Sequence, residues 1–193
     1  MKNLSPYSWR KTIPEELQLP ALKALSYYPE LQTKKIVFKY TRKEGTSIMK
    51  AQPDIKSVLR LGNDRSYVIF VNRTISLDNK THQIHTLPEE VLTGWFGHEL
   101  GHVMDYERLG KWGLIRFGIS YLLSGSFVKG AEQRADNIAV AHGMGEQILA
   151  TKSYILNHAG ISERYKQKIR KLYPSPEQIM EVIKGQKDIA AIS

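Results

Sequence analysis

The segment His98-Glu99-Leu100-Gly101-His102 places two imidazoles and a carboxylate at a spacing that suits metal chemistry. Histidines four residues apart share one face of a helix, so both rings can bind a single zinc ion. Glu99 lies at the edge of that face, where its carboxylate reaches a zinc-bound water more easily than the ion itself. Zinc lowers the pKa of a bound water to about 7, and a glutamate can take the proton as the water attacks a carbonyl.

A pattern with so few fixed positions also arises by chance, with both histidines as ordinary core residues and Glu99 as a surface acid. The surrounding segment argues against chance, because its apolar residues recur at helical spacing on nearly all sides and predict a buried helix. Two histidines and a glutamate would be costly inside such a helix unless a metal ion compensated them. We therefore favour the metal site.

A tetrahedral catalytic site needs a third protein ligand and one open position. Glu132 and Asp136 lie four residues apart, on one face of a later predicted helix. Small residues flank that face and would let the two helices approach closely: Ala131, Ala135 and Ala139. Glu132 is the predicted third ligand, and Asp136 would accept the second ring N–H of a ligand histidine and fix its tautomer. The alternative is a solvated acid pair beside Arg134.

These motifs together resemble the gluzincin metallopeptidases, and most closely the family of the CAAX prenyl protease and the HtpX-type peptidases. The resemblance rests on HELGH, on E-x-x-A-D at residues 132–136 and on Gly143, and it covers residues 66–182. It implies a zincin-like fold in which His98, His102 and Glu132 bind Zn2+, and in which Asp136 supports a ligand. The tail segment 171–179 resembles the family's Thr-His-Pro segment near the end of the catalytic domain.

The sequence departs from this family in two respects. The transmembrane helices of the family are missing, apart from one apolar run. Tyr173 stands where the family has a histidine before proline, and no arginine follows at the family's spacing. The residue that donates to an oxyanion in the transition state therefore stays open among several candidates, each of which could equally be structural. They are Tyr173, His142 and His158, with Tyr154 and Tyr165 in addition.

Gluzincins also hold the substrate backbone by adding it as a strand to an edge strand above the zinc helix. The segment Tyr67–Ser76 is the strongest strand signal in the sequence and lies just before the predicted zinc helix. We therefore expect this strand to carry the substrate-binding edge, at Val71, Asn72 and Arg73. The alternative is an ordinary interior strand.

The longest apolar run, Trp112–Val128, follows directly on the predicted zinc helix. A central Arg116 and the shortness of the run disfavour a bilayer span. Its glycines and serines suit close packing, so we expect a buried helix or a pocket wall, with an interfacial helix as the alternative.

Further elements are needed to position these residues. Residues 12–31 are predicted to be helical, with a break at Pro20. Residues 34–77 are rich in β formers and predict a small sheet, with turn signals at Glu44-Gly45 and Gly62-Asn63.

Helical patterns fill the remainder of the chain. Residues 87–142 hold the predicted zinc helices, and residues 145–185 form a helical tail. Strands followed by helices indicate an α+β fold, in which a small mixed or antiparallel sheet packs on the zinc helix. The length of 193 residues fits one domain spanning 1–193.

Composition narrows the function further. The hydrophobic fraction of 41% can supply a core, and the absence of cysteine leaves only histidine and carboxylate ligands for a metal. The net charge of +9 favours anionic partners, but the basic residues are spread thinly and no nucleic-acid motif is present. A solvated basic surface is the preferred interpretation. The N-terminus lacks the apolar stretch of a secretory signal, which favours a cytoplasmic location.

We expect a zinc-dependent endopeptidase that acts on a peptide or protein substrate, with peripheral membrane contact as an open alternative. Two other functions stay in view. The first is a zinc-binding regulatory domain with impaired catalysis, which the absence of histidine at position 173 suggests. The second is a repressor-clipping regulatory protease of the ImmA/IrrE type, which shares HELGH and suits the basic charge, although that group carries a different acidic motif downstream.

Overall fold

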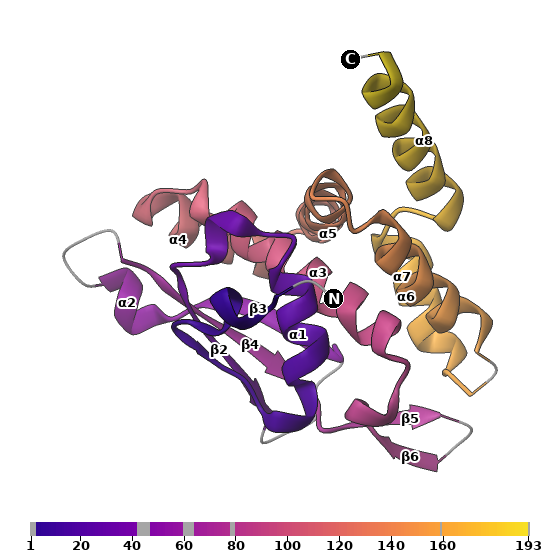
Figure 1. The fold of residues 1–193 in the computed structure, drawn as a ribbon, viewed down its shortest axis with the longest axis horizontal. Coiled ribbons are helices and arrows are strands. Elements are labelled where there is room, and N and C mark those ends of the chain that lie inside the picture. Colours follow the sequence, from indigo (N-terminus) through magenta and orange to yellow (C-terminus); the bar gives the residue numbers. More distant parts are fainter. Residues whose placement is uncertain (1–2, 42–46, 60–63, 78–79, 159, 193) are drawn as a thin grey trace.

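The computed structural model describes residues 3–41, 47–59, 64–77, 80–158 and 160–192, with side chains up to residue 185. The turns predicted at Glu44-Gly45 and Gly62-Asn63 lie outside these residues. Strands dominate the first half of the chain and long helices the second half (Figure 1). The predicted α+β class and its order, sheet first and helices after, are confirmed.

The elements follow one another in this order. The N-terminal half contains η1 (Ser5–Ser8), β1 (Lys11–Thr12), η2 (Glu15–Leu17), α1 (Gln18–Leu25), η3 (Pro29–Leu31), β2 (Lys35–Tyr40), β3 (Met49–Pro53), α2 (Ile55–Leu59), β4 (Ser66–Val71), β5 (Thr74–Leu77), β6 (Lys80–Gln83) and η4 (Ile84–Thr86). The C-terminal half contains α3 (Glu89–Glu107), α4 (Lys111–Leu123), α5 (Gly125–Ala141), α6 (Gly145–Asn157), α7 (Glu163–Leu172) and α8 (Pro176–Ile192).

The main sheet is mixed, with the strand order β1-β2-β4-β3. β2 pairs in parallel with β1 and β4, whereas β3 pairs antiparallel with β4, so that Ala51 lies opposite Ile69. Alternate residues of β4 are buried, and the Phe38 ring of β2 meets the Phe96 ring of α3 edge-on at 5.4 Å. The sheet therefore packs against α3, as the sequence predicts.

The strand predicted at residues 67–76 is divided in two. β4 ends at Val71, and β5 begins at Thr74 and forms a hairpin with β6. The expected free edge is also wrong, because β4 lies inside the sheet, paired with β2 and with β3. The alternating pattern of residues 67–76 predicts a half-buried strand but does not report which strands flank it.

The predicted helical break at Pro20 is wrong. Pro20 is the third residue of α1, within the first turn, where backbone N–H groups have no partner inside the helix. A proline at this position removes no intrahelical hydrogen bond, so the helix continues to Leu25.

Helix α3 is the centre of the molecule. It is buried along most of its 19 residues, and two acids in its first turn, Glu89 and Glu90, complement the helix dipole. α5 and α6 approach it closely: a side chain at Gly101 would collide with the backbone of Ala135 in α5, and one at Gly94 with α6. The predicted close approach of the alanine-rich helix is confirmed.

Helix α4 departs from the expected burial. Leu114 and Phe117 are buried, and residues of this helix line a groove, so the predicted pocket wall is confirmed. The opposite side is exposed, with Trp112 at 80% and Leu122 at 84% of their surface open to solvent, so the prediction of a buried helix is wrong there. Among the described residues, no helix is long and apolar enough to cross a membrane.

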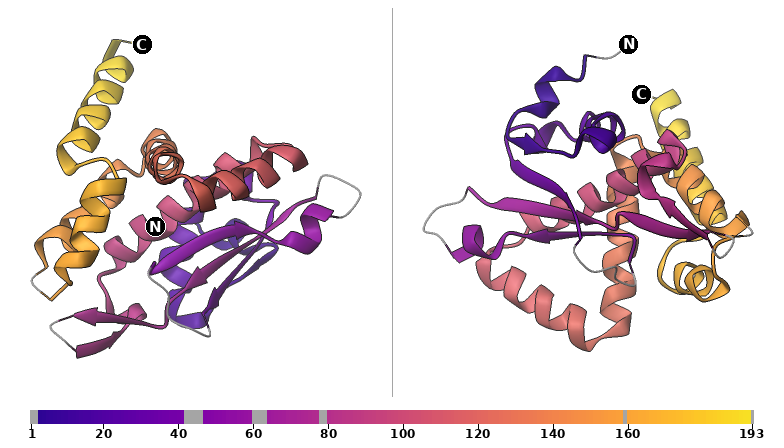
Figure 2. Two further views of the ribbon diagram at one scale, coloured as in Figure 1. Left: turned by 180° about the vertical axis from the view of Figure 1, so that it is seen from behind. Right: turned by 90° about the horizontal axis from the view of Figure 1, so that it is seen from below.

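The helical tail agrees with the sequence prediction in its elements. α6 and α7 pack beside α3 and α5, and α8 projects from the same end of the molecule (Figures 1 and 2). Gly143, predicted to stop the preceding helix, has φ +85°, a conformation that favours glycine and ends α5.

Candidate metal centre

Three ligand atoms converge between α3 and α5. His98 Nε2 lies 3.1 Å and His102 Nε2 lies 3.4 Å from Glu132 Oε2. The two histidines are one turn apart on α3, and Glu132 faces them from α5. One nitrogen of each ring and one carboxylate oxygen lie within 4.8 Å of one another, and all three residues are buried. These residues could therefore hold a metal ion.

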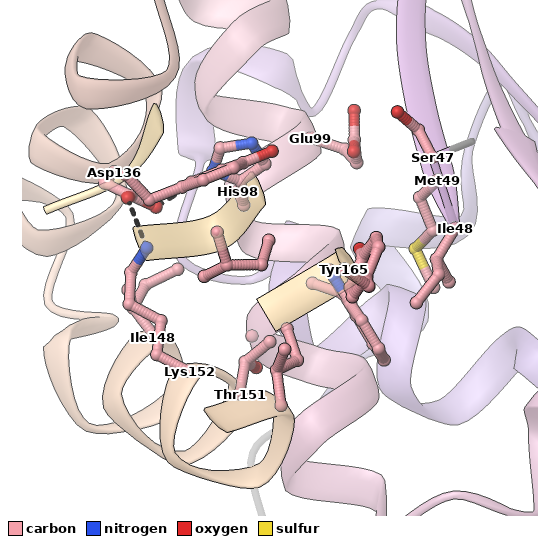
Figure 3. A pocket seen from close by; sticks show the side chains of 15 residues that line it. Ser47, Ile48, Met49, His98, Glu99, Asp136, Ile148, Thr151, Lys152 and Tyr165 are labelled. Carbon is pink, nitrogen blue, oxygen red and sulfur yellow. Dashed lines mark hydrogen bonds and ion pairs between the residues drawn. The ribbon is translucent and has the colours of Figure 1, made fainter. Parts of the chain in front are cut away.

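Asp136 orients the first histidine, as its position one turn after Glu132 predicts. His98 Nδ1 lies 2.9 Å from Asp136 Oδ1, which leaves Nε2 to face Glu132. On its other side Asp136 forms an ion pair with Lys152 of α6, with Nζ and Oδ2 2.8 Å apart (Figure 3). Asp136 is 1% and Glu132 is 4% exposed, which excludes the alternative of a solvated acid pair. Arg134 instead pairs with Asp105, at 3.0 Å.

The electrostatics of the centre favour a cation. Burial lowers the pKa of His98, but Asp136 and then Glu132 outweigh it and raise the pKa to about 10. Burial raises the pKa of Glu132, yet its hydrogen bonds with His102 and His98 hold it far below the ordinary value. Two ionised carboxylates thus surround the imidazoles, so a proton or a metal ion is stabilised there.

The donor set fits zinc. Two imidazole nitrogens and one carboxylate oxygen form the ligand combination of catalytic zinc sites, which keep a fourth position open. The fit is less complete at His102, because its Nδ1 is buried with no hydrogen-bond partner among the described residues to orient the ring. With Nδ1 shielded in this way, Nε2 is the atom of His102 that faces Glu132.

Glu99 lies beside the ligands on α3. Its side chain is buried, and Oε2 accepts a hydrogen bond from the backbone N–H of Ala51 in β3, at 2.6 Å. Burial raises the pKa of this carboxyl, which is the direction expected for a group that exchanges protons near neutral pH. The predicted general base is therefore within reach of the centre and of the sheet edge.

A large groove opens over this centre. It has a volume of about 940 Å³, and Glu99, His102 and Glu132 line it. β3 and α2 form one side and α4 the other, with mainly apolar side chains. These include Met49, Val58, Phe70, Leu114 and Phe117.

A second, much smaller cavity of about 30 Å³ lies behind the centre (Figure 3). Its walls include His98, Asp136 and Lys152, together with Tyr165. It has room for little more than a water molecule.

The oxyanion candidates separate in the structure. Tyr173 lines both cavities, and its ring lies 5.3 Å from that of His98. Burial and then Glu132 raise the pKa of Tyr173, so the phenol stays protonated and can donate. His142 binds Ile138 O and Glu30, and His158 accepts from the N–H of Gly160.

Of the two remaining candidates, Tyr165 is half-buried and lines the small cavity, and Tyr154 packs against the hydrophobic core. The structure thus places Tyr173, one of the five candidates, beside the ring of the predicted ligand His98.

The sequence analysis did not identify several residues that contact the centre. Tyr121 donates to Glu132 Oε1 at 2.9 Å, although its position in an apolar run gives no sign of this. Tyr106 donates to the carbonyl of Ala51 at 3.3 Å. Lys152 lies on a different helix from the motif residues, with no local pattern that marks it. The i to i+4 spacing of Tyr106 from His102 was the one available signal.

The strand nearest the groove also differs from the prediction. Val71 is the last residue of the interior strand β4 and Asn72 follows it, whereas β3 is the edge of the sheet and lines the groove from Met49 to Pro53. Asn72 borders the groove as well, and Arg73 is exposed, stacked over the Tyr40 ring at 4.2 Å. The edge over the centre belongs to β3.

Comparisons of the chain with protein-family models, with curated proteins and with solved structures found no match. The resemblance to the gluzincins therefore stays a prediction that depends on the motif residues alone.

Proposed function

We propose that this chain is a zinc-dependent endopeptidase with a zincin-like, gluzincin arrangement of its centre. The observation that carries the proposal is the convergence of His98, His102 and Glu132 at the floor of a groove, with Glu99 beside them. A structural metal site would be closed by a fourth protein ligand. Here the ligand set borders an open groove large enough for a peptide.

The roles of the side chains follow from their positions. Zinc, when bound, supplies Lewis acidity that activates a water and polarises a carbonyl. Glu99 would accept a proton from that water and deliver it to the nitrogen of the departing amine. Tyr173, a protonated phenol next to Glu132, would donate to the oxygen on which negative charge develops. Asp136 and Lys152 hold the His98 ring in place.

The edge strand β3 is the surface that would hold the substrate backbone. A peptide can extend the sheet there as an added strand, with its side chains alternating between the apolar walls and the solvent. The backbone groups of Ala51 at this edge are engaged by Glu99 and Tyr106. A substrate strand and Glu99 would therefore compete for the backbone groups of Ala51. Pairing of the substrate with Ala51 would free the Glu99 carboxylate to act at the scissile bond.

Two observations favour a second function. Glu99 is held by Ala51, and tyrosine occupies position 173, so a zinc-binding regulatory domain with impaired catalysis would have the same ligands. Both functions predict the same zinc content, but only the endopeptidase would cleave peptides at an appreciable rate.

The test is Glu99→Gln, compared with Glu90→Gln, which changes an exposed acid in the first turn of the same helix. Glu99→Gln should keep about one zinc per chain and lose at least ~100-fold in cleavage rate on an unbiased peptide library. Glu90→Gln should retain the wild-type rate. Equal cleavage by both variants would remove Glu99 from the reaction, and no cleavage by the zinc-loaded wild type would favour the regulatory domain.

A further inference from the structure

Helix α4 is apolar on two opposite faces. Leu114, Phe117 and Tyr121 turn toward the groove, and the Phe117 ring packs edge-on against Tyr106 at 5.2 Å. The outer face of α4 consists of exposed apolar residues at helical spacing: Trp112, Ile115, Ile119, Leu122 and Leu123. A helix at the surface of a folded protein normally has polar residues on the face turned away from the core.

Helix α2 continues this surface across the groove. Ile55 and Leu59 are 69% and 76% exposed, and both also line the groove. Ile115 and Leu122 do the same on the side of α4. Both helices lie at one end of the molecule, opposite β6 and α8 (Figures 1 and 2). We call the outer face of α4 together with Ile55 and Leu59 the rim of the groove.

The charged side chains on α4 and within α2 are basic, although Asp54 directly precedes Ile55. With about 100° between successive residues of a helix, Lys111 and Arg116 flank the apolar stripe of α4 on its two sides. Both are exposed, as is Lys56 between the two apolar residues of α2. The sequence contains no acidic residue from 108 to 131. An apolar stripe between basic side chains, with a tryptophan at one end, is the pattern of helices that lie in the surface of an anionic bilayer.

We propose that the rim docks on the surface of an anionic lipid bilayer, with α4 lying in the plane of the interface. The apolar residues enter the boundary between headgroups and acyl chains, and Lys111 and Arg116 bind the headgroups. The mouth of the groove then faces the bilayer, which admits peptide segments located at the membrane surface. Docking goes beyond the proposed function, because it depends on the rim and on no residue of the metal centre.

Charge favours a bilayer over a second copy of this chain. In a two-fold dimer through the rim, the same patch faces itself, and the lysine and arginine side chains of both copies would be brought together. The chain as a whole carries +9, which adds to that repulsion. Anionic headgroups offer the complementary charge.

The first experiment is flotation with vesicles of phosphatidylcholine alone or of phosphatidylcholine mixed with phosphatidylserine. The protein should float with the mixed vesicles, and salt should weaken binding, since charges are screened beyond about 8 Å at physiological ionic strength. Leu122→Ser with Leu123→Ser should lower partitioning by about 10- to 100-fold. The matched control, Met180→Ser with Val182→Ser, makes the same kind of change in exposed residues of α8 and should bind as the wild type.

The second experiment separates position from net charge. Lys111→Gln with Arg116→Gln should reduce binding to the mixed vesicles by about 30-fold, since each basic residue near such a surface contributes about 1 kcal/mol. Lys80→Gln with Lys184→Gln removes the same charge at the opposite end of the molecule and should reduce binding far less. Circular dichroism establishes that each variant is folded.

Three results would overturn the proposal. Absence of flotation at low salt with the mixed vesicles is one, and equal losses in the rim variants and their controls are another. The third is a dimer in analytical ultracentrifugation that Leu122→Ser with Leu123→Ser dissociates, because it would make a second copy the occupant of the rim. Cleavage activity enters none of these readouts, so a failed endopeptidase assay leaves the docking result intact.

Discussion

The metal centre and the rim of the groove use opposite kinds of side chain in opposite environments. In the metal centre, ionisable groups are buried, and His98, Glu132 and Asp136 are each held by at least two partners. On the rim, large apolar side chains are exposed to solvent, with Trp112 and Leu122 among them. The two regions are adjacent in sequence, since α4 joins the helix of the histidines to the helix of Glu132.

Both regions depart from the usual distribution of side chains, in which apolar residues are buried in the core and charged residues face the solvent. Burying charged groups removes them from water, and the loss is offset only when partners or a cation are supplied. Exposing a contiguous apolar surface leaves burial energy unused until something covers it. The comparison suggests that each region is completed by a ligand from outside the chain, a cation in the centre and a lipid surface at the rim.

The largest expected effect concerns the centre. Replacing His98 and His102 together by alanine should abolish zinc binding and lower the cleavage rate by three orders of magnitude or more, roughly the scale of losing a complete catalytic group. Vesicle binding should be unchanged. The control replaces His82 of β6 and His85 of η4, and should keep zinc. Full zinc retention in elemental analysis of the double variant at 98 and 102 would exclude the proposed ligands.

Asp136→Asn tests the support of the ligands. The amide keeps the shape but loses the charge that orients His98 and pairs with Lys152. Zinc affinity should fall by roughly 10- to 100-fold, the usual effect of changing the partner of a ligand histidine. Asp105→Asn, which changes another buried acid of the same region, should leave the zinc dissociation constant unaltered. Competition with a zinc indicator dye measures both, and identical constants for Asp136→Asn and the wild type would contradict the assigned role.

The pH dependence of the metal-free protein is a smaller effect. His98 has a pKa of about 10 in the folded chain against an ordinary value of 6.5 in the unfolded chain, so protonation of His98 stabilises the folded state. This contribution is complete below pH 6.5 and is lost as the pH rises toward 10. The Tm of the metal-free protein should therefore fall by roughly 5 °C or more between pH 6.5 and 9.

Bound zinc replaces that proton, so the zinc-loaded protein should show little of this decline, and zinc affinity should rise with pH over the same range. Differential scanning calorimetry with and without zinc separates the two curves. A Tm that declines equally in both forms would show that other groups dominate.

Local motifs made much of the centre predictable from sequence. The helical spacing of His98 and His102, and of Glu132 and Asp136, reports which side chains share a helix face, and the structure brings these four together. The alanines beside Glu132 predict the close approach of α5 to α3, which Gly101 completes. Lys152 and Tyr121 could not be found, because their contacts depend on how α6 and α4 pack, and packing leaves no periodic trace in either helix.

The order of the strands and the exposure of α4 could not be predicted from the sequence. The alternating pattern of β4 is the same for an interior and an edge strand, so the edge was placed there and not on the shorter β3. The apolar residues of α4 led us to expect a buried helix. Buried residues are mostly apolar, but the reverse does not hold, because apolar residues are often exposed, as they are on the outer face of α4. Glycines and serines in the run strengthened the wrong expectation, although Gly118 contacts nothing that a side chain would displace.

The smallest expected effect is on the free energy of unfolding, and it can be compared directly between the metal centre and the rim. Leu100, between the histidines, is fully buried, and its replacement by alanine should lower the free energy of unfolding by about 2–5 kcal/mol. Leu122 on the rim is 84% exposed, so the same replacement should change it by less than about 0.5 kcal/mol in solution. Urea unfolding of both variants without lipid measures the difference. A loss at Leu122 as large as that at Leu100 would mean that the rim is already covered in solution, and the surface would then belong to a protein contact. A change in the free energy of unfolding near zero for the Leu122 variant, together with weaker vesicle binding by the same variant, would show that this side chain contributes to docking and not to the stability of the fold.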